Sequence, residues 1–164
     1  MPINSTDIQF RLSGGAANSS DEASLGGVKS STTVSGTLLD DVSGADSQAG
    51  DVEYRCEYVH NNHGTLQLTN PVVWLQALGL GGGHVIAIGV GSAAVNGVEQ
   101  SVADENTAPV GVTFSTPTTL GAGLALGNLP AGQHKAVWVR RTVTGGSGAS
   151  ANGYTLRVTG DTAA

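Results

Sequence analysis

Apolar and polar residues alternate along several short segments of this chain, and a period of two is typical of half-buried β-strands. The alternation predicts strands at residues 7–12, 52–58, 65–69, 136–141 and 154–159. Three further segments are apolar runs, interpreted as two more deeply buried strands and one short strand: residues 72–75, 85–90 and 110–114. No long glycine-free window carries the apolar spacing of an amphipathic helix. The pattern therefore indicates a chain built of short strands.

The turn residues complete the predicted architecture. Asn61, Asn62, His63 and Gly64 separate two alternating segments, which predicts a hairpin between residues 52–58 and 65–69. We expect an all-β fold, an antiparallel β-sandwich or jelly-roll-like domain spanning residues 1–164. Residues 13–50 are weakly patterned and predict a long loop or arm, either functional or ordered by a partner.

Composition narrows the class of protein. The 164 residues include 25 glycines and only 12% charged residues, and Gly, Ala, Ser and Thr together supply 75 positions. Charge-rich disorder, a collagen repeat and a membrane-spanning apolar run are all inconsistent with this sequence. The net charge of −6 and the scattered basic residues argue against a nucleic-acid partner. Residues 1–5 lack the features of a secretory signal, so we expect the chain to stay in the cytoplasm or in a particle assembled there.

Two glycine-rich runs and four histidines are the residues that most resemble a chemical motif. Residues 89–92 and 145–148 lack the lysine and the strand-to-helix context of a phosphate-binding loop. His60 and His63 form a His-x-x-His pair, which we interpret as solvated polar residues at a turn. Zinc is the alternative, for which His84 and His134 elsewhere in the chain could supply further ligands. The sequence predicts no catalytic residue, no cofactor and no metal site.

Two acidic clusters offer oxygen ligands without a calcium-loop pattern. They are Asp40–Asp41 and the Asp104, Glu105, Asn106 run. We interpret both as solvated loops, with calcium as the alternative.

The aromatic residues and the single cysteine favour burial. Trp74 and Trp138 lie in apolar segments, so core packing is favoured over a carbohydrate platform. Tyr54 and Tyr58 share a predicted face with Cys56, which we expect to be a buried reduced thiol.

Arg140 and Arg141 are consecutive residues of one predicted strand, so their side chains should point to opposite faces. One of them is then expected to point toward the core or an adjoining subunit. A buried arginine needs a carboxylate partner, which Glu53, Glu57 or an acid of another chain could supply.

Several of these segments together resemble small virion structural proteins of tailed bacteriophages. They are DVEYRCEYVHN at 51–61, LQLTN at 66–70, VW at 73–74, ADENTAP at 103–109 and GQHKAVWVRR at 132–141. The resemblance covers roughly residues 50–160 and the strand at 7–12. It marks strands and turns, so it assigns no functional residue.

The resemblance implies a non-enzymatic capsid decoration, or cement, protein on the surface of a virion. Its expected partners are the major capsid protein and further copies of itself, as a dimer or trimer. The expected contact segments are residues 13–50 and the loops at 79–83 and 145–148, where small side chains allow close backbone approach. A tail, neck or baseplate protein is the alternative. A carbohydrate-binding module using Trp74 or Trp138 and an enzyme are weaker alternatives.

Overall fold

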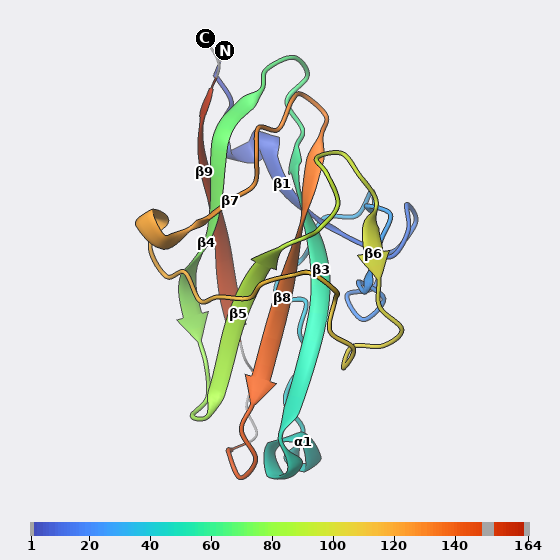
Figure 1. Cartoon of the computed structure of the whole chain (residues 1–164), viewed down its shortest axis with the longest axis vertical. Helices are drawn as coiled ribbons and strands as arrows, with labels where there is room; N and C mark the ends of the chain where they lie inside the picture. The colour runs from blue at the N-terminus through green and yellow to red at the C-terminus, as the bar shows by residue number, and fades with distance from the viewer. Residues whose placement is uncertain (1, 149–152, 163–164) are drawn as a thin grey trace.

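A computed structural model describes residues 2–148 and 153–162 of the chain (Figure 1). The strands are β1 (Ile8–Leu12), β2 (Gly26–Gly27), β3 (Asp51–Asn61), β4 (Leu68–Gly79), β5 (His84–Val90), β6 (Glu99–Ser101), β7 (Leu124–Ala125), β8 (His134–Val143) and β9 (Gly153–Thr162). The helical elements are α1 (Gly44–Ala49) and two 3-10 turns, η1 (Ser5–Asp7) and η2 (Leu120–Ala122).

The strands form antiparallel sheets. A four-stranded sheet has the order β1-β3-β8-β5, a three-stranded sheet has the order β7-β4-β9, and β2 pairs with β6. The predicted all-β class is confirmed, and the finer label of sandwich or jelly roll stays a prediction. No helix among the described residues is long and apolar enough to cross a membrane.

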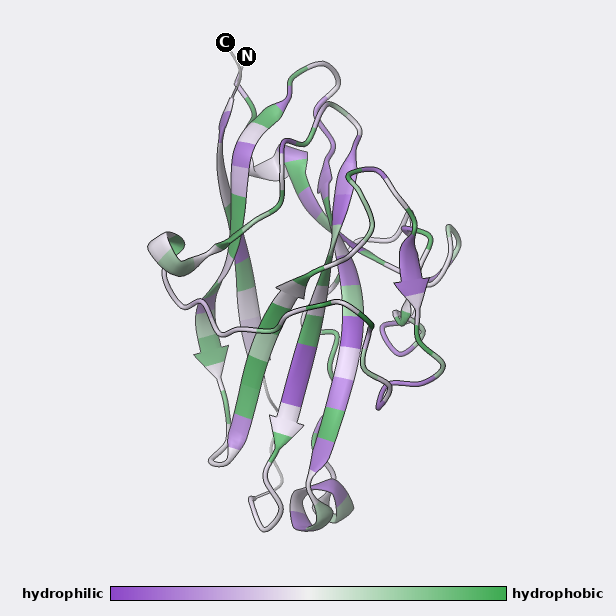
Figure 2. Cartoon of the chain, viewed as in Figure 1, coloured by the Kyte–Doolittle hydropathy of each residue, from purple (hydrophilic) through white to green (hydrophobic). Residues whose placement is uncertain are grey.

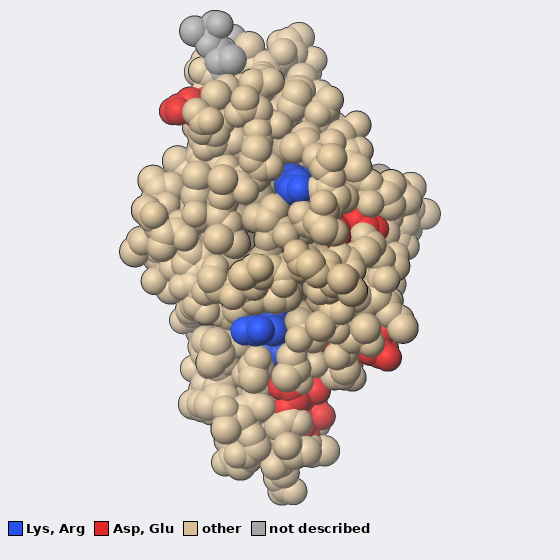
Figure 3. Space-filling view, viewed as in Figure 1, with Lys and Arg blue, Asp and Glu red and all other residues tan. Residues whose placement is uncertain are grey.

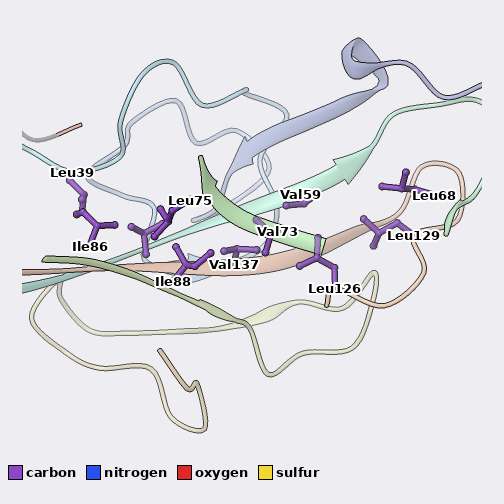
Figure 4. Packing of buried hydrophobic residues seen from close by; sticks show 11 residues of the cluster. Leu39, Val59, Leu68, Val73, Leu75, Ile86, Ile88, Leu126, Leu129 and Val137 are labelled. Carbon is purple, nitrogen blue, oxygen red and sulfur yellow. The ribbon is translucent and has the colours of Figure 1, made fainter. Parts of the chain in front are cut away.

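The main core lies between the four-stranded and the three-stranded sheet (Figures 1 and 4). Val59, Val137 and Ile88 come from the first sheet, and Val73 and Leu75 from the second; all are buried. The alternation of apolar and polar residues along the strands, visible in Figure 2, aims these branched side chains at the same space. Burial of such side chains contributes roughly 1.5–3 kcal/mol each to stability.

A second, smaller core covers the opposite face of the four-stranded sheet. Cys56, Tyr58 and Trp138 are its largest members, and each is fully buried. The hydroxyl of Tyr58 donates to the Gly27 carbonyl and accepts from the Glu99 N–H, which fastens the β2–β6 pair to this face. Both faces of β3 are therefore buried, whereas its alternating sequence had predicted a half-buried strand.

The predicted hairpin between residues 52–58 and 65–69 is wrong. β3 and β4 follow each other in the chain but belong to different sheets. The Asn61 side chain donates to the carbonyls of Leu66 and Leu129, both at 2.8 Å, and so holds the connection between the two layers. A turn signal fixes where a chain reverses, but not which strand it then pairs with.

Residues 68–69 of one predicted strand and 72–75 of the next belong to the single strand β4, and residues 65–67 lie outside any strand. β4 runs through Pro71 with a register shift between Thr69 and Val72, and Asn70 adopts φ 49° there. Proline is tolerated in a strand at such an irregularity. The strand predicted at 110–114 is not formed, and Val110 is 81% exposed.

Residues 13–50 are part of the domain and not an extended arm. Leu38, Leu39 and Val42 are buried, and Leu39 joins the main core. The segment also crosses back over β1, where the N–H of Val34 donates to the Phe10 carbonyl. At its end, Ser43 caps α1 by accepting the Asp46 N–H at 3.2 Å. The weak sequence pattern reflects irregular backbone that is nevertheless packed.

Candidate functional site

Five charged side chains form a partly buried cluster at one end of β3. Arg55 is 1% exposed, and one of its Nη atoms lies 3.0 Å from Glu53 and 3.2 Å from Asp40 and also contacts Glu105. Arg141 forms an ion pair with Glu53 and donates to the Asp40 carbonyl. The residues come from β3, β8, the 13–50 segment and the loop after β6. The cluster therefore ties four parts of the chain together.

The cluster also shows what the two acidic motifs of the sequence contact. Oxygens of Asp40, Glu53 and Glu105 lie within 4.8 Å of one another, and no other described residues form such a three-carboxylate or histidine group. The guanidinium of Arg55 contacts all three carboxylates, so a cation of the chain itself already pairs with them. Asp40 and Glu105 are solvent-accessible, as expected for acidic loops, with 53% and 40% of their side chains exposed, and both also form ion pairs with Arg55.

The prediction for the arginine pair is confirmed. Arg141 is 4% exposed and points toward the main core, with Glu53 as its carboxylate. Arg140 points to the other face, where its guanidinium lies 5.1 Å from the centre of the Phe114 ring. Burial raises the pKa of Glu53 to about 7, against the opposing effect of Arg141 and Arg55.

The histidines differ in their burial and in the contacts they make. His60 and His134 are cross-strand neighbours of β3 and β8 with ring centres 6.4 Å apart. Burial lowers the pKa of His60 to about 4, so its ring is neutral near pH 7. His63 accepts the N–H groups of Thr65 and Leu66 through Nδ1. The interpretation as solvated residues is therefore wrong for His60, which is buried.

The tryptophans differ in their surroundings. Trp138 is fully buried, as predicted. Trp74 faces away from Val73 and Leu75, which point into the main core, and it remains partly exposed opposite Arg157 of β9. The expected core position of Trp74 is wrong, because it alternates with the core residues of β4.

Cys56 and the first glycine motif have structural roles. Cys56 is free and fully buried, and burial raises the pKa of its thiol well above the usual value. A Cβ atom on Gly89 would lie 2.5 Å from Val112 Cγ1 and 2.7 Å from the Thr113 carbonyl oxygen. Glycine at 89 therefore permits close packing of a loop on β5 rather than binding of phosphate.

The sequence patterns did not predict an apolar groove, nor the buried acid in the cavity next to it. The groove, of about 410 Å³, lies between β1 and β9, with Ile8, Phe10, Leu156 and Val158 in its lining. A neighbouring cavity of about 180 Å³ is lined by Glu57 and Tyr154 among others, and the Tyr154 hydroxyl lies 3.3 Å from Glu57 Oε1. Glu57 and Val59 are two residues apart on β3 and therefore point to the same face, which was the sequence signal that Glu57 points inward.

Glu57 provides a direct test of this buried acid. Burial raises its pKa to about 8, so the folded chain binds the proton more tightly than the unfolded chain does. This contribution to stability is complete below about pH 4.5 and is lost as the pH rises to about 8. As the pH rises from about 5 to 9, the free energy of unfolding of Glu57→Gln should increase relative to that of wild type by an amount on the order of a few kcal/mol.

Urea denaturation at a series of pH values measures this difference. Glu22→Gln is a control, because Glu22 is exposed. Parallel pH profiles for wild type and Glu57→Gln would contradict the prediction.

Comparison of the chain with models of protein families, with curated proteins and with solved structures gave no match.

Proposed function

We propose that this chain is a non-enzymatic capsid decoration protein of a tailed bacteriophage. It binds the major capsid protein lattice and stabilises it through many repeated contacts. The resemblance of its strand and turn segments to phage virion proteins supports this function, as does its domain of strands joined by loops rich in small residues.

One structural observation carries the proposal, namely the convergence of the expected contact loops. The loop at 79–83, the loop at 145–148 and α1, which is the last part of the 13–50 segment, lie together at the end of the molecule opposite the termini (Figure 1). The N–H of Thr144 donates to Gly83, and that of Gly146 donates to Ser47, at 2.9 and 2.8 Å. We call these three segments the small-residue end.

The small-residue end suits docking on a regular protein surface. Small side chains allow close backbone approach and lose little conformational entropy when they are covered. Charged side chains are sparse on the face shown in Figure 3, and the acidic ones gather in its lower part, toward the small-residue end. Modest contacts of this kind add up when one copy touches two neighbouring capsomers.

Substitution of one exposed glycine tests the docking end. A Cβ atom at Gly82 meets nothing within 4 Å, and the same is true of Gly64 at the far end of the molecule. We expect Gly82→Arg to weaken binding to expanded capsids at least about tenfold, whereas Gly64→Arg binds like wild type. Cosedimentation with capsids measures the difference. Equal binding by all three proteins would contradict the assigned docking end.

The position and copy number of the chain in an intact particle test the function itself. Decoration requires hundreds of copies distributed over the head, measurable by quantitative mass spectrometry and immunogold labelling. A few copies at the tail would support the alternative of a tail, neck or baseplate protein. Absence from purified particles would overturn both.

A further inference from the structure

β9 is a long edge strand with an open side. It pairs with β4, and among the described residues outside β4 none forms a backbone–backbone hydrogen bond with it; the Ile3 N–H donates to the Thr162 side chain at its last residue. Thr155, Arg157, Thr159 and Asp161 are exposed along its outer face. A strand of this length presents a row of unpaired N–H and C=O groups that can bind another strand.

The other sheet edges are covered or short. On β1, the N–H groups of Val34 and Leu12 bond across to Phe10 and Thr32. On β5, Ile88 and Ser115 exchange two backbone hydrogen bonds at 2.8 and 2.9 Å. β7 has two residues. Among the described strands that end these two sheets, β9 is thus the one that combines length with an open side.

The groove described above lies directly beneath this open edge. Ile8 and Phe10 of β1 and Leu156 and Val158 of β9 are apolar side chains of its lining, and each is only partly buried. The two sheets therefore leave their common core incompletely closed on this side. A strand added to β9 would cover these side chains.

The charged side chains on β9 indicate which strand would pair with its open edge. Arg157 and Asp161 are equally distant from Thr159 along the strand and point to the same outer face. If two β9 strands pair antiparallel with their Thr159 residues opposite each other, each Arg157 faces Asp161 of the other copy. The arrangement creates two opposite-charge pairs at once. Like charges directly opposite each other would be unfavourable, so this register is self-complementary.

We infer that two copies of this chain associate through β9, forming one continuous six-stranded sheet across a two-fold axis at Thr159. The sheet order is β7-β4-β9 in one copy, followed by β9-β4-β7 in the other. Main-chain hydrogen bonds join the two edges, the charge pairs fix the register, and the second copy closes the groove. The dimer forms whether or not the chain decorates a capsid.

Charge reversal tests the interface with matched variants. Arg157→Asp and Asp161→Arg each replace two attractive cross-strand contacts with two repulsive ones, so each variant alone should dimerise at least about tenfold more weakly than wild type. The double variant Arg157→Asp/Asp161→Arg keeps the net charge of −6 and reverses both positions, so it should dimerise like wild type. An equal mixture of the two single variants should form heterodimers, because all their facing charges are then opposite.

Sedimentation velocity of the full chain over a concentration series measures these affinities, and thermal melting checks that each variant is folded. Wild-type chain that remains monomeric up to about 1 mM, where association is worth only about 4 kcal/mol, overturns the inference. A wild-type dimer that is unaffected by either single reversal also overturns it, because the interface then lies elsewhere. Failure of the double variant to recover dimerisation counts equally against the Thr159 register.

Discussion

Replacement of Arg141 by methionine is expected to lower the free energy of unfolding by about 3–5 kcal/mol at pH 8. Glu53 is 1% exposed and has a pKa of about 7, so it is largely ionised at that pH. Without Arg141, this carboxylate keeps Arg55 as its remaining contact and loses the partner directly opposite it in the β3–β8 register. The loss is large because the remaining buried charge is poorly compensated.

The neighbouring arginine supplies the control. Arg140→Met removes the same side chain from the next position of β8, but Arg140 is only partly buried and its guanidinium contacts the Phe114 ring. We expect a loss of about 1 kcal/mol or less from this substitution. Chemical denaturation of both variants measures the difference, and equal losses would show that the ion pair has no special role.

A double substitution separates the charge from the packing. Glu53→Gln/Arg141→Met removes both charges of the pair, so the free energy lost should be smaller than the sum of the two single losses. Additive losses would mean that Glu53 and Arg141 act independently. That outcome would contradict the direct contact between them.

The sequence predicted well those features that depend on local alternation. Strands β1, β3, β8 and β9 lie where the apolar period placed them, and β5 lies at a predicted apolar run. The opposite directions of Arg140 and Arg141 follow from the same period of two. The burial of Cys56 and Trp138 was also predictable, because Cys56 shares a face with Tyr54 and Tyr58 and Trp138 lies within an apolar segment. Period two determines which residues share a face, and a buried face needs apolar groups or paired charges.

Features that depend on distant pairing were not predictable. Turn chemistry between β3 and β4 did not show that the chain changes sheets there, and the acids of residues 40 and 105 gave no sign that Arg55 would join them. These contacts connect residues far apart in sequence, whereas propensity and period describe only neighbours. The open edge of β9 has the same origin, since it follows from sheet order.

Substitution of Leu39 tests whether the 13–50 segment contributes to the stability of the core. Leu39 is 5% exposed and packs in the main core with residues of both sheets. We expect Leu39→Ala to lower the free energy of unfolding by about 2–5 kcal/mol, through lost apolar burial and the cavity that remains. A detached capsid-binding arm would give no such loss.

Leu120→Ala is the matched control, because Leu120 is 47% exposed in η2 and its truncation creates no buried cavity. Its expected loss is within about 0.5 kcal/mol. Denaturation of both variants, followed by tryptophan fluorescence, separates the two roles of the 13–50 segment. Unchanged stability of Leu39→Ala would mean that the segment is dispensable for the fold and free to bind a partner. The expected loss would mean that deleting residues 13–50 unfolds the domain, so that contacts with a capsid must be tested by surface substitutions at the small-residue end instead.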